Sequence, residues 1–253
     1  FKPAVAAAAL AAGIDPDDTV NCTGRYLYYS GYQPRCLQDR HGGPVDLRTA
    51  LLYSCNIFFY DTGRRLGVDV FSAMARQLGL AGPTGVELPE AEGRLTWSGD
   101  SNYQSGLTLM AAIGQGNTAV TPAQLAVYAA TLATGGQRPT LHFASHAADP
   151  ATGQTVWQYA PQFTAVAGGE SVFGPIRDGM VRMARSTRVL REAPVPCAAK
   201  TGSPQRAEQM PGGGYYTNSV LIGYAPADDP QIAVSVVLEY GGGCLLYTSP
   251  SPR

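Results

Sequence analysis

The chain has 253 residues, a formal net charge of −1 and 45% hydrophobic residues, which is enough apolar material for a packed core. Positive and negative residues are interspersed and form no basic patch, so nucleic acid and anionic membrane surfaces are not expected as partners. No apolar run approaches the ~18 residues of a membrane span, so any membrane anchor would lie outside this chain.

The first part of the chain is predicted to be mainly helical. We expect an amphipathic, alanine-rich helix over residues 2–12, with Gly13 as its C-terminal cap. Asp46 is a suitable N-cap for a second helix, which would run through Leu52 and break near Ser54. Further helices are expected over residues 56–66, 69–78 and 121–135, the last opened by the capping box Thr121-Pro122-Ala123-Gln124.

The second part of the chain is predicted to end in strands. Residues 142–148 and 155–159 are expected to pair as a hairpin, followed by a helix over residues 171–185. Strand patterns follow over residues 197–203, 217–224 and 232–240. This order, with helices first and antiparallel strands last, favours one mixed α+β domain over residues 1–243. Residues 244–253 are similar to one translation frame of a transposon-derived sequencing adapter, so we interpret them as a non-native tail, with a natural Ser/Pro tail as the alternative.

Two lysines are the most informative residues of the chain. The other sixteen of the eighteen basic residues are arginines, and Lys2 and Lys200 lie in the motifs Phe1-Lys2-Pro3 and Lys200-Thr201-Gly202. An arginine stays protonated in a protein, whereas a buried lysine beside another cation loses its proton more easily and can act as a base. A third motif, Ser54-Cys55-Asn56, lies between them. Taken singly, Ser54 could be a helix cap, Asn56 a turn residue and Thr201 an ordinary strand residue.

Taken in order, the three motifs resemble the S-x-x-K, S-x-N and K-T-G set of penicillin-binding proteins and serine β-lactamases. Longer stretches strengthen the resemblance: Ser-Cys-Asn-Ile-Phe-Phe-Tyr at 54–60, Ala-Ala-Ile-Gly-Gln-Gly at 111–116 followed by Thr-Pro-Ala-Gln-Leu, and Tyr-Ala-Pro-Ala-Asp-Asp-Pro at 224–230. From Phe1 to about Gly243, the chain is similar to class B penicillin-binding proteins of the penicillin-binding protein 2 type. The resemblance implies the transpeptidase fold shared with β-lactamases, an antiparallel sheet beside a helical subdomain, here expected to be truncated at both ends.

The resemblance also implies a role for each motif residue. The nucleophilic serine of the family would lie two positions upstream of Phe1, so the chain by itself is expected to be inactive. Lys2 would be the base that takes the proton of this serine, with a pKa lowered by burial and by Lys200. Ser54 would relay that proton to the departing D-alanine, and Lys200 would supply positive potential. The residues that would bind substrate are Asn56, Thr201, Gly202 and Ser203, with the backbone N–H of Ser203 as half of an oxyanion hole.

The activity implied by the resemblance is peptidoglycan D,D-transpeptidation. In this reaction a serine takes the acyl group of a D-Ala-D-Ala stem peptide and passes it to an amine on a neighbouring strand, and β-lactam antibiotics block it. The implied partners are stem peptides, β-lactams and a membrane-embedded glycosyltransferase of the cell-wall machinery, and the implied location is the extracytoplasmic face of the cell membrane. No cofactor is implied.

Two alternatives remain open at this stage. One is a D,D-carboxypeptidase or β-lactamase of the same fold, and the other is a non-enzymatic β-lactam sensor domain. A class A β-lactamase also needs a glutamate that activates the deacylating water. Glu87, Glu90 and Glu92 lie between the second and third motifs, but their Leu-Pro-Glu-Ala-Glu-Gly context is unlike the loop that carries that glutamate.

Other residues near the motifs predict local structure only. Gly114 and Gly116 are interpreted as a backbone turn near the cleft, because the pattern of a phosphate-binding loop fails at Ala119. Ser203 and Pro204 depart from the family's usual sequence after K-T-G but keep the hydroxyl. Residues 104–108 replace a stretch that contains an acid in the family, which leaves the contacts of this expected loop open.

The histidines are not expected to form a metal site. His142 and His146 are four residues apart on an expected strand, where that spacing does not make side chains converge, and His41 has no obvious partner.

The cysteines give weaker evidence. Cys55 and Cys197 lie in the expected helix and strand positions beside the site, where small buried thiols fit. Cys22 and Cys36 flank a Tyr-rich segment, residues 26–32, and either a disulfide or two unpaired cysteines remains possible.

Overall fold

The computed structural model describes residues 1–37, 41 and 43–242. The tail expected over residues 244–253 lies outside this part of the chain. The helices are α1 (Lys2–Ala11), α2 (Leu47–Tyr53), α3 (Asn56–Leu66), α4 (Val68–Gln77), α5 (Ser105–Ala112), α6 (Pro122–Ala133), α7 (Gly169–Ser186) and α8 (Arg188–Arg191). The strands are β1 (Val20–Asn21), β2 (Pro44–Val45), β3 (Gln137–Pro139), β4 (His146–Ala148), β5 (Thr155–Gln158), β6 (Phe163–Ala165), β7 (Ala198–Gly202), β8 (Gln205–Gln209), β9 (Tyr215–Thr217), β10 (Ser219–Ala225) and β11 (Ile232–Leu238).

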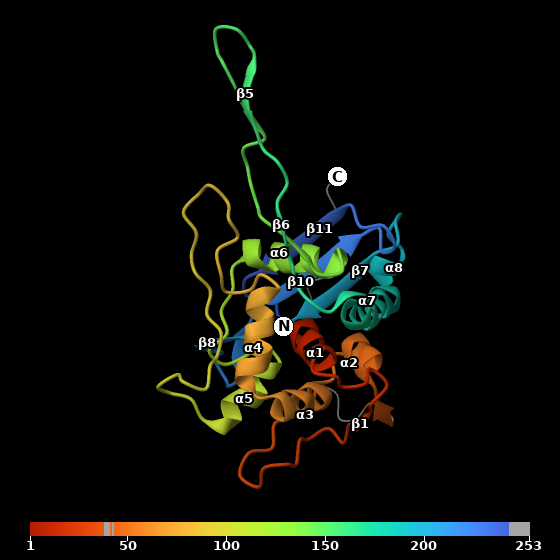
Figure 1. The fold of residues 1–253 in the computed structure, drawn as a ribbon. Helices are drawn as coiled ribbons and strands as arrows, with labels where there is room; N and C mark the ends of the chain where they lie inside the picture. Colours follow the sequence, from red (N-terminus) through yellow and green to blue (C-terminus); the bar gives the residue numbers. More distant parts are fainter. Residues whose placement is uncertain (38–40, 42, 243–253) are drawn as a thin grey trace.

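A three-stranded antiparallel sheet carries the last motif. Its strand order is β11-β10-β7, and Lys200 on β7 lies opposite Ile222 on the central strand. Helix α6 packs against β10 and β11, α7 packs against β7, and α1 contacts α7 (Figure 1). The expected α+β class and the three expected strands are therefore confirmed.

The helix boundaries follow from local capping. The Asp46 side chain accepts a hydrogen bond from the backbone N–H of Thr49 and starts α2, and both hydrogen bonds of the capping box are present at Thr121 and Gln124. These caps are the ones that the sequence predicts. The expectation for α1 was wrong in one respect, because the helix is not amphipathic: its residues from Lys2 to Ala9 are all buried. Alanine side chains are small enough for neighbouring elements to surround the helix on all sides.

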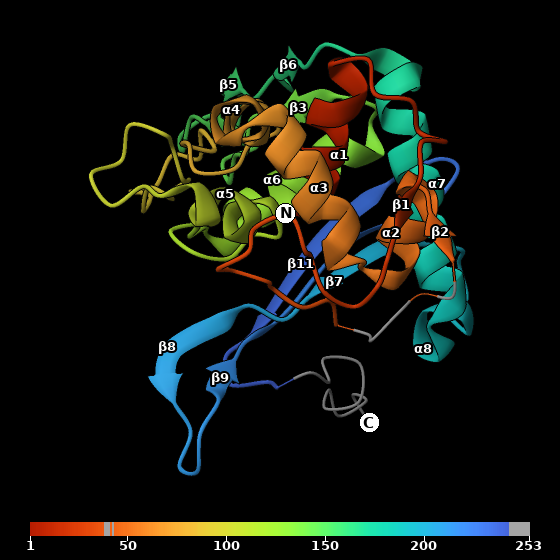
Figure 2. The ribbon, with the colours of Figure 1, turned by 90° about the horizontal axis from the view of Figure 1, so that it is seen from below.

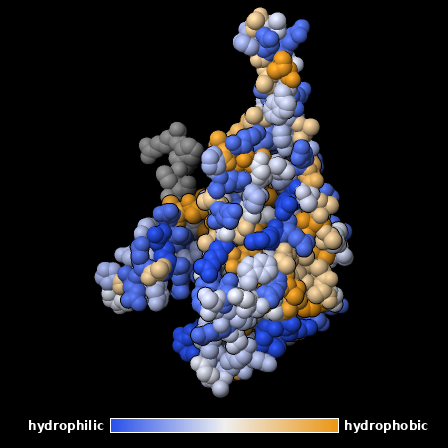
Figure 3. All heavy atoms as spheres, turned by 60° about the vertical axis from the view of Figure 1, so that its left-hand side comes forward, coloured by the Kyte–Doolittle hydropathy of each residue, from blue (hydrophilic) through white to orange (hydrophobic). Residues whose placement is uncertain are grey.

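Other elements differ from the sequence-based expectations. Residues 104–108 were expected as a loop, but Gln104 is the N-cap and residues 105–108 form the first half of α5. The hairpin is shorter than expected, because β4 begins at His146, and the ring of His142 stacks on Tyr159 outside the strand. This hairpin projects from the body of the molecule (Figures 1 and 3). Figure 2 shows that β8 and β9 form a second projecting ribbon, which was not predicted. The strands β8 and β9 are mostly exposed and lie outside the main core, so no hydrophobic alternation marks them in the sequence.

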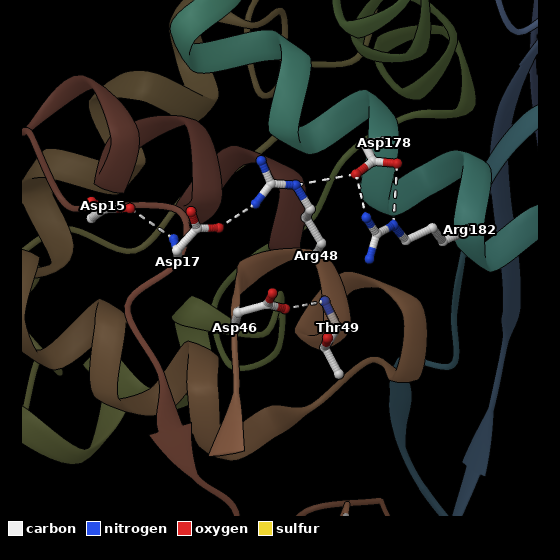
Figure 4. A network of polar contacts seen from close by, with 7 residues as sticks. All are labelled: Asp15, Asp17, Asp46, Arg48, Thr49, Asp178 and Arg182. Carbon is white, nitrogen blue, oxygen red and sulfur yellow. Dashed lines mark hydrogen bonds and ion pairs between the residues drawn. The ribbon is translucent and has the colours of Figure 1, made fainter. Parts of the chain in front are cut away.

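Helix α2 is held against α7 by close packing and by charge. A side chain at Gly179 on α7 would approach Leu51 to 2.8 Å, so glycine there lets the two helices approach closely. On the adjacent surface, Arg48 pairs with Asp17 and with Asp178, which also pairs with Arg182 (Figure 4). Partly exposed ion pairs contribute little energy each, so most of the stabilisation between α2 and α7 comes from packing. The ion pairs add contacts at defined positions on the surface beside α2.

Within the residues that the structure describes, no helix has the length and apolar character needed to cross a bilayer.

Candidate active site

The site is centred on the side chain of Lys2, at the start of α1. Its Nζ lies 2.6 Å from the backbone O of Ser54, 2.9 Å from Ser54 Oγ and 2.7 Å from Asn56 Oδ1. A protonated amine donates all three hydrogen bonds. A neutral amine keeps two N–H donors and offers its lone pair to the Ser54 hydroxyl. The arrangement therefore permits a proton to move between Lys2 and Ser54 without any change of partners.

A break between two helices brings Ser54 and Asn56 to Lys2. Ser54 ends α2 in the left-handed conformation, with φ 57° and ψ 40°, and Asn56 is the first residue of α3. The backbone N–H of Cys55 donates to the O of Ala50, which closes the last turn of α2. A non-glycine residue with positive φ costs roughly 1 kcal/mol and is often found at functional sites. Here the conformation directs both Ser54 and Asn56 toward one amine.

Burial and charge change the acid–base behaviour of both lysines. Lys2 and Lys200 are only 7% and 5% exposed. Burial, and second the positive charge of Lys200, lower the pKa of Lys2 to about 7, partly opposed by Cys36 and Cys55. Burial lowers the pKa of Lys200 to about 8. Near neutral pH a large fraction of Lys2 is therefore unprotonated, as a base requires.

A cavity of about 500 Å³ lies beside the K-T-G strand. Gly202, Ser203 and Gly114 are among its lining residues, together with Phe1. Gly114 has a φ of 79°, and a side chain at this position would approach Phe1 to 2.6 Å. The turn expected at Gly114 is confirmed, and glycine there keeps this wall of the cavity open.

Some of the predicted site residues are in hydrogen-bonding contact with one another, whereas others only lie near the same cavity or interact through charge. Lys2, Ser54 and Asn56 are in hydrogen-bonding contact. Lys200 acts on Lys2 through charge, while its own Nζ donates to the backbone O of Thr201 at 3.1 Å. Gly202 and Ser203 face the cavity beside the strand.

Two of the three glutamates considered between the second and third motifs, Glu87 and Glu90, have hydrogen-bond partners elsewhere. The Glu90 carboxylate accepts from the backbone N–H and the hydroxyl of Thr84. The Glu87 carboxylate accepts from the backbone N–H of Phe143, near the base of the projecting hairpin. Both acids therefore hold local loops in place.

A second cluster, missed from the sequence, lies against the same motif. Its members are Cys22, Cys36, His41 and Cys55, whose sulfur atoms and one imidazole nitrogen all lie within 4.8 Å of one another. His41 Nδ1 lies 3.1 Å from Cys22 Sγ, and Cys36 Sγ lies 3.9 Å from Cys55 Sγ. The expectation that His41 has no partner was wrong, and Cys22 and Cys36 are thiols that are not joined by a disulfide.

The donor set of this cluster fits a zinc-like ion. Three thiols and one imidazole are ligands typical of structural zinc sites, and two thiolates bound at ~2.3 Å in a tetrahedron lie about 3.8 Å apart. The Cys36–Cys55 separation of 3.9 Å is close to that value. The expectation of no metal site compared the histidines only with one another. Considering the three cysteines together with His41 over residues 22–55 would have indicated a possible metal-binding set.

The chain matches a known family along nearly its whole length. Residues 1–250 match the penicillin-binding protein transpeptidase domain. The chain is 31% identical over 220 residues to the peptidoglycan D,D-transpeptidase MrdA of Acinetobacter baumannii, with 79% of this chain and 32% of the relative covered. It is 32% identical over 261 residues to the peptidoglycan D,D-transpeptidase PbpA of Mycolicibacterium smegmatis, with 98% of this chain and 50% of the relative covered. The chain thus spans about a third to a half of the curated relatives it matches.

Solved structures agree with this match. The chain superposes with a TM-score of 0.83 on penicillin-binding protein A of Mycobacterium tuberculosis, at 29% identity, covering 95% of this chain and 54% of the other. With the imipenem acyl-enzyme complex of that protein the TM-score is 0.84, at 28% identity, covering 96% of this chain and 55% of the other.

Proposed function

Because the chain belongs to the penicillin-binding protein transpeptidase domain family, we propose that it forms most of the transpeptidase domain of a peptidoglycan D,D-transpeptidase. In this proposal residues 1–243 are domain and residues 244–253 are a non-native tail. The observation that carries the proposal is the Lys2 amine, which is buried, bonded to Ser54 and Asn56, and has a pKa near 7. An amine in this state is suited to activating a serine hydroxyl.

In the first chemical step, a serine two positions upstream of Phe1 attacks the carbonyl carbon of the penultimate D-alanine. Neutral Lys2 takes the proton of the serine as the C–O bond forms. When the tetrahedral intermediate collapses, the C–N bond breaks, and the leaving D-alanine nitrogen receives a proton from Lys2 through the Ser54 hydroxyl. An acceptor amine then attacks the acyl-serine ester; the new C–N bond forms, the ester C–O bond breaks, and the proton lost by the amine returns to the serine oxygen through Lys2.

The remaining residues position the substrate in this proposal. Asn56 hydrogen-bonds the amide backbone of the stem peptide, which fixes the scissile carbonyl for attack. Lys200 supplies positive potential to the terminal carboxylate, and Thr201 and Ser203 offer hydroxyls to it. The open edge of the strand at Gly202 lets the peptide lie beside β7, and the backbone N–H of Ser203 donates to the developing oxyanion.

Two other activities of this fold are less well supported. A class A β-lactamase needs a glutamate that activates water, and Glu87 and Glu90 are engaged with the backbone of neighbouring loops. A β-lactam sensor domain would share the motifs, but the relatives reported above are named as peptidoglycan D,D-transpeptidases.

The location and partners of the parent protein follow from the same proposal. A domain that acts on stem peptides works on the extracytoplasmic face of the cell membrane. A structural neighbour with 32% identity comes from a study of polymerization and crosslinking by a peptidoglycan synthase complex. A membrane-embedded glycosyltransferase, which polymerises the strands to be cross-linked, is therefore the proposed partner.

Labelling with a fluorescent penicillin tests this function. A version of the chain extended upstream through the motif serine should become covalently labelled, and the 253-residue chain should not. The control is the extended chain with the serine replaced by alanine. Comparable labelling of the short chain would contradict the assignment of the nucleophile.

A further inference from the structure

The cysteine–histidine cluster is in direct contact with the catalytic motif. Cys55 lies between Ser54 and Asn56 in the sequence, and the backbone N–H of Asn56 donates to Cys36 Sγ at 3.3 Å. The Asn56 side chain also donates from Nδ2 to the backbone O of Arg35 at 3.2 Å. The segment Arg35–Cys36 therefore holds Asn56 from the side opposite Lys2.

We propose that Cys36 and Cys55 are a modification site, at which a hydroperoxide oxidises the two thiols to a disulfide that displaces Asn56, and that a zinc ion bound in the same cluster prevents this oxidation. The effect on Asn56 rests on the function proposed above. The oxidation itself follows from the arrangement of the sulfur atoms.

The geometry favours this pair over the others in the cluster. Cys36 Sγ donates a hydrogen bond to Cys55 Sγ at 3.9 Å and also lies 3.9 Å from His41 Nδ1, whereas Cys22 Sγ is held more closely by His41 Nδ1, at 3.1 Å. Cys36 is half-buried and Cys55 is fully buried. A small peroxide therefore reaches Cys36 first, and Cys55 is in position to react with the product.

The chemistry proceeds in two balanced steps. Cys36 attacks the peroxide, the O–O bond breaks, and sulfenic acid and an alcohol, or water from hydrogen peroxide, are formed. The Cys55 thiol then attacks the sulfenic sulfur, which forms the S–S bond and releases water. Two thiols are oxidised and one peroxide is reduced, and thiol–disulfide exchange with an added dithiol reverses the modification.

The disulfide would change the position of Asn56. Sulfur atoms now 3.9 Å apart would come to about 2.05 Å, so at least one of the two sulfur atoms must move by rotation of its side chain or by a shift of its backbone. Movement of the Cys36 sulfur breaks its contact with the Asn56 N–H, and a shift of the Cys55 backbone would carry Ser54 and Asn56 with it. A displacement of ~1 Å at a positioning residue can reduce a rate about 100-fold.

Peptide mapping tests the modification without any enzymatic assay. The reduced, metal-free chain, carrying Cys244→Ser, is treated with hydrogen peroxide; free thiols are then alkylated and cross-linked peptides are identified by mass spectrometry. The expected result is a Cys36–Cys55 link, retained in the matched control Cys197→Ser and absent in Cys36→Ser. Prior addition of zinc chloride should suppress the link.

Three outcomes would overturn the proposal: a Cys22–Cys36 link, oxidation of Cys36 without any link, or equal linking with and without zinc. The wild-type map decides the matter even if Cys36→Ser does not fold.

Labelling with fluorescent penicillin then tests the consequence in the chain extended upstream through the serine. The oxidised form should label at least about 10-fold more slowly and recover with dithiothreitol. If the reduced form does not label, the proposed function is contradicted. If the reduced and oxidised forms label equally, the proposed effect of the disulfide on Asn56 is contradicted.

Discussion

Lys2 shows how the environment of one side chain sets its chemistry. An exposed lysine would be a strongly hydrated cation with a pKa near 10.5, but at this position water is replaced by two fixed oxygen partners from Ser54 and one from Asn56. The proximity of Lys200 further disfavours the charged form. These contacts stabilise whichever form of Lys2 is present, while burial shifts the balance toward the neutral amine.

Replacing Lys2 by arginine should abolish acylation in the chain extended through the serine. A guanidinium keeps the charge and hydrogen bonds but does not accept the serine proton near neutral pH. Stopped-flow measurement of penicillin acylation gives the rate, and thermal unfolding checks the fold. Arg65→Lys, on the exposed side of α3, is a control with the reverse exchange. An acylation rate of Lys2→Arg close to that of the wild type would remove Lys2 from the role of base.

The acylation rate should also rise with pH through about 7, because the pKa of Lys2 is lowered to about 7 and only the neutral amine accepts a proton. Removing the positive charge of Lys200, as in Lys200→Gln, should raise the pKa of Lys2 and move this ascending limb to higher pH. The quantity to compare is the pH midpoint of the acylation rate, since Lys200→Gln will also weaken substrate binding. An unchanged midpoint would show that the two lysines are not electrostatically coupled.

Strand β11 has two different faces. Ala233 and Val237 pack against the hydrophobic core, while Ile232 and Val236 are 65% and 45% exposed. Among the strands that the structure describes, β11 is also at the end of the sheet order, beside β10. An apolar strand at the edge of a sheet is a site of self-association.

The 253-residue chain should therefore aggregate through β11. The double variant Ile232→Lys and Val236→Lys should lower the apparent mass in analytical ultracentrifugation, because charged residues on an edge strand oppose pairing between copies. Val156→Lys is the matched control, since Val156 is 69% exposed but lies on the projecting hairpin. A wild-type chain that is monomeric and unfolds reversibly would refute this prediction.

At the scale of the whole molecule, the helical part and the sheet meet at the site. Lys2, Ser54 and Asn56 come from three helices or their ends, and Lys200 comes from β7. Two glutamates between the second and third motifs, Glu87 and Glu90, are bound to loops near the projecting hairpin. In the proposed function, the described part of the fold thus provides groups for forming an acyl-enzyme, and it engages both of these carboxylates elsewhere.

The penicilloyl form of the extended chain should consequently persist for many minutes, measured as decay of the adduct by intact mass spectrometry. Glu90→Gln should leave this lifetime unchanged and lower the thermal stability, because it weakens hydrogen bonds to Thr84. Release of the adduct within seconds would favour a β-lactamase, and loss of rapid release in Glu90→Gln would identify this acid as the group that activates water.

Much of the architecture was set by local sequence. The caps at Asp46 and Thr121 are made by residues within one helical turn, and the break at Ser54 and the strands β7, β10 and β11 follow from propensity and periodicity. The motif residues could be selected from the sequence because their order and surroundings resemble one family. Helix α5 could not be predicted from the sequence, because its residues show little amphipathic pattern and its stability comes from packing.

Tertiary structure alone decided which groups meet. The contact of Lys2 with Ser54 and Asn56 joins residues more than fifty positions apart, and the pKa of Lys2 depends on burial and on a charge from another part of the chain. The cluster of Cys22, Cys36, His41 and Cys55 has the same origin, because the loop after α1 folds back onto the start of α3. Residue types and spacings list the available donors, but folding determines the distances between them, and electrostatic and covalent chemistry depend on those distances.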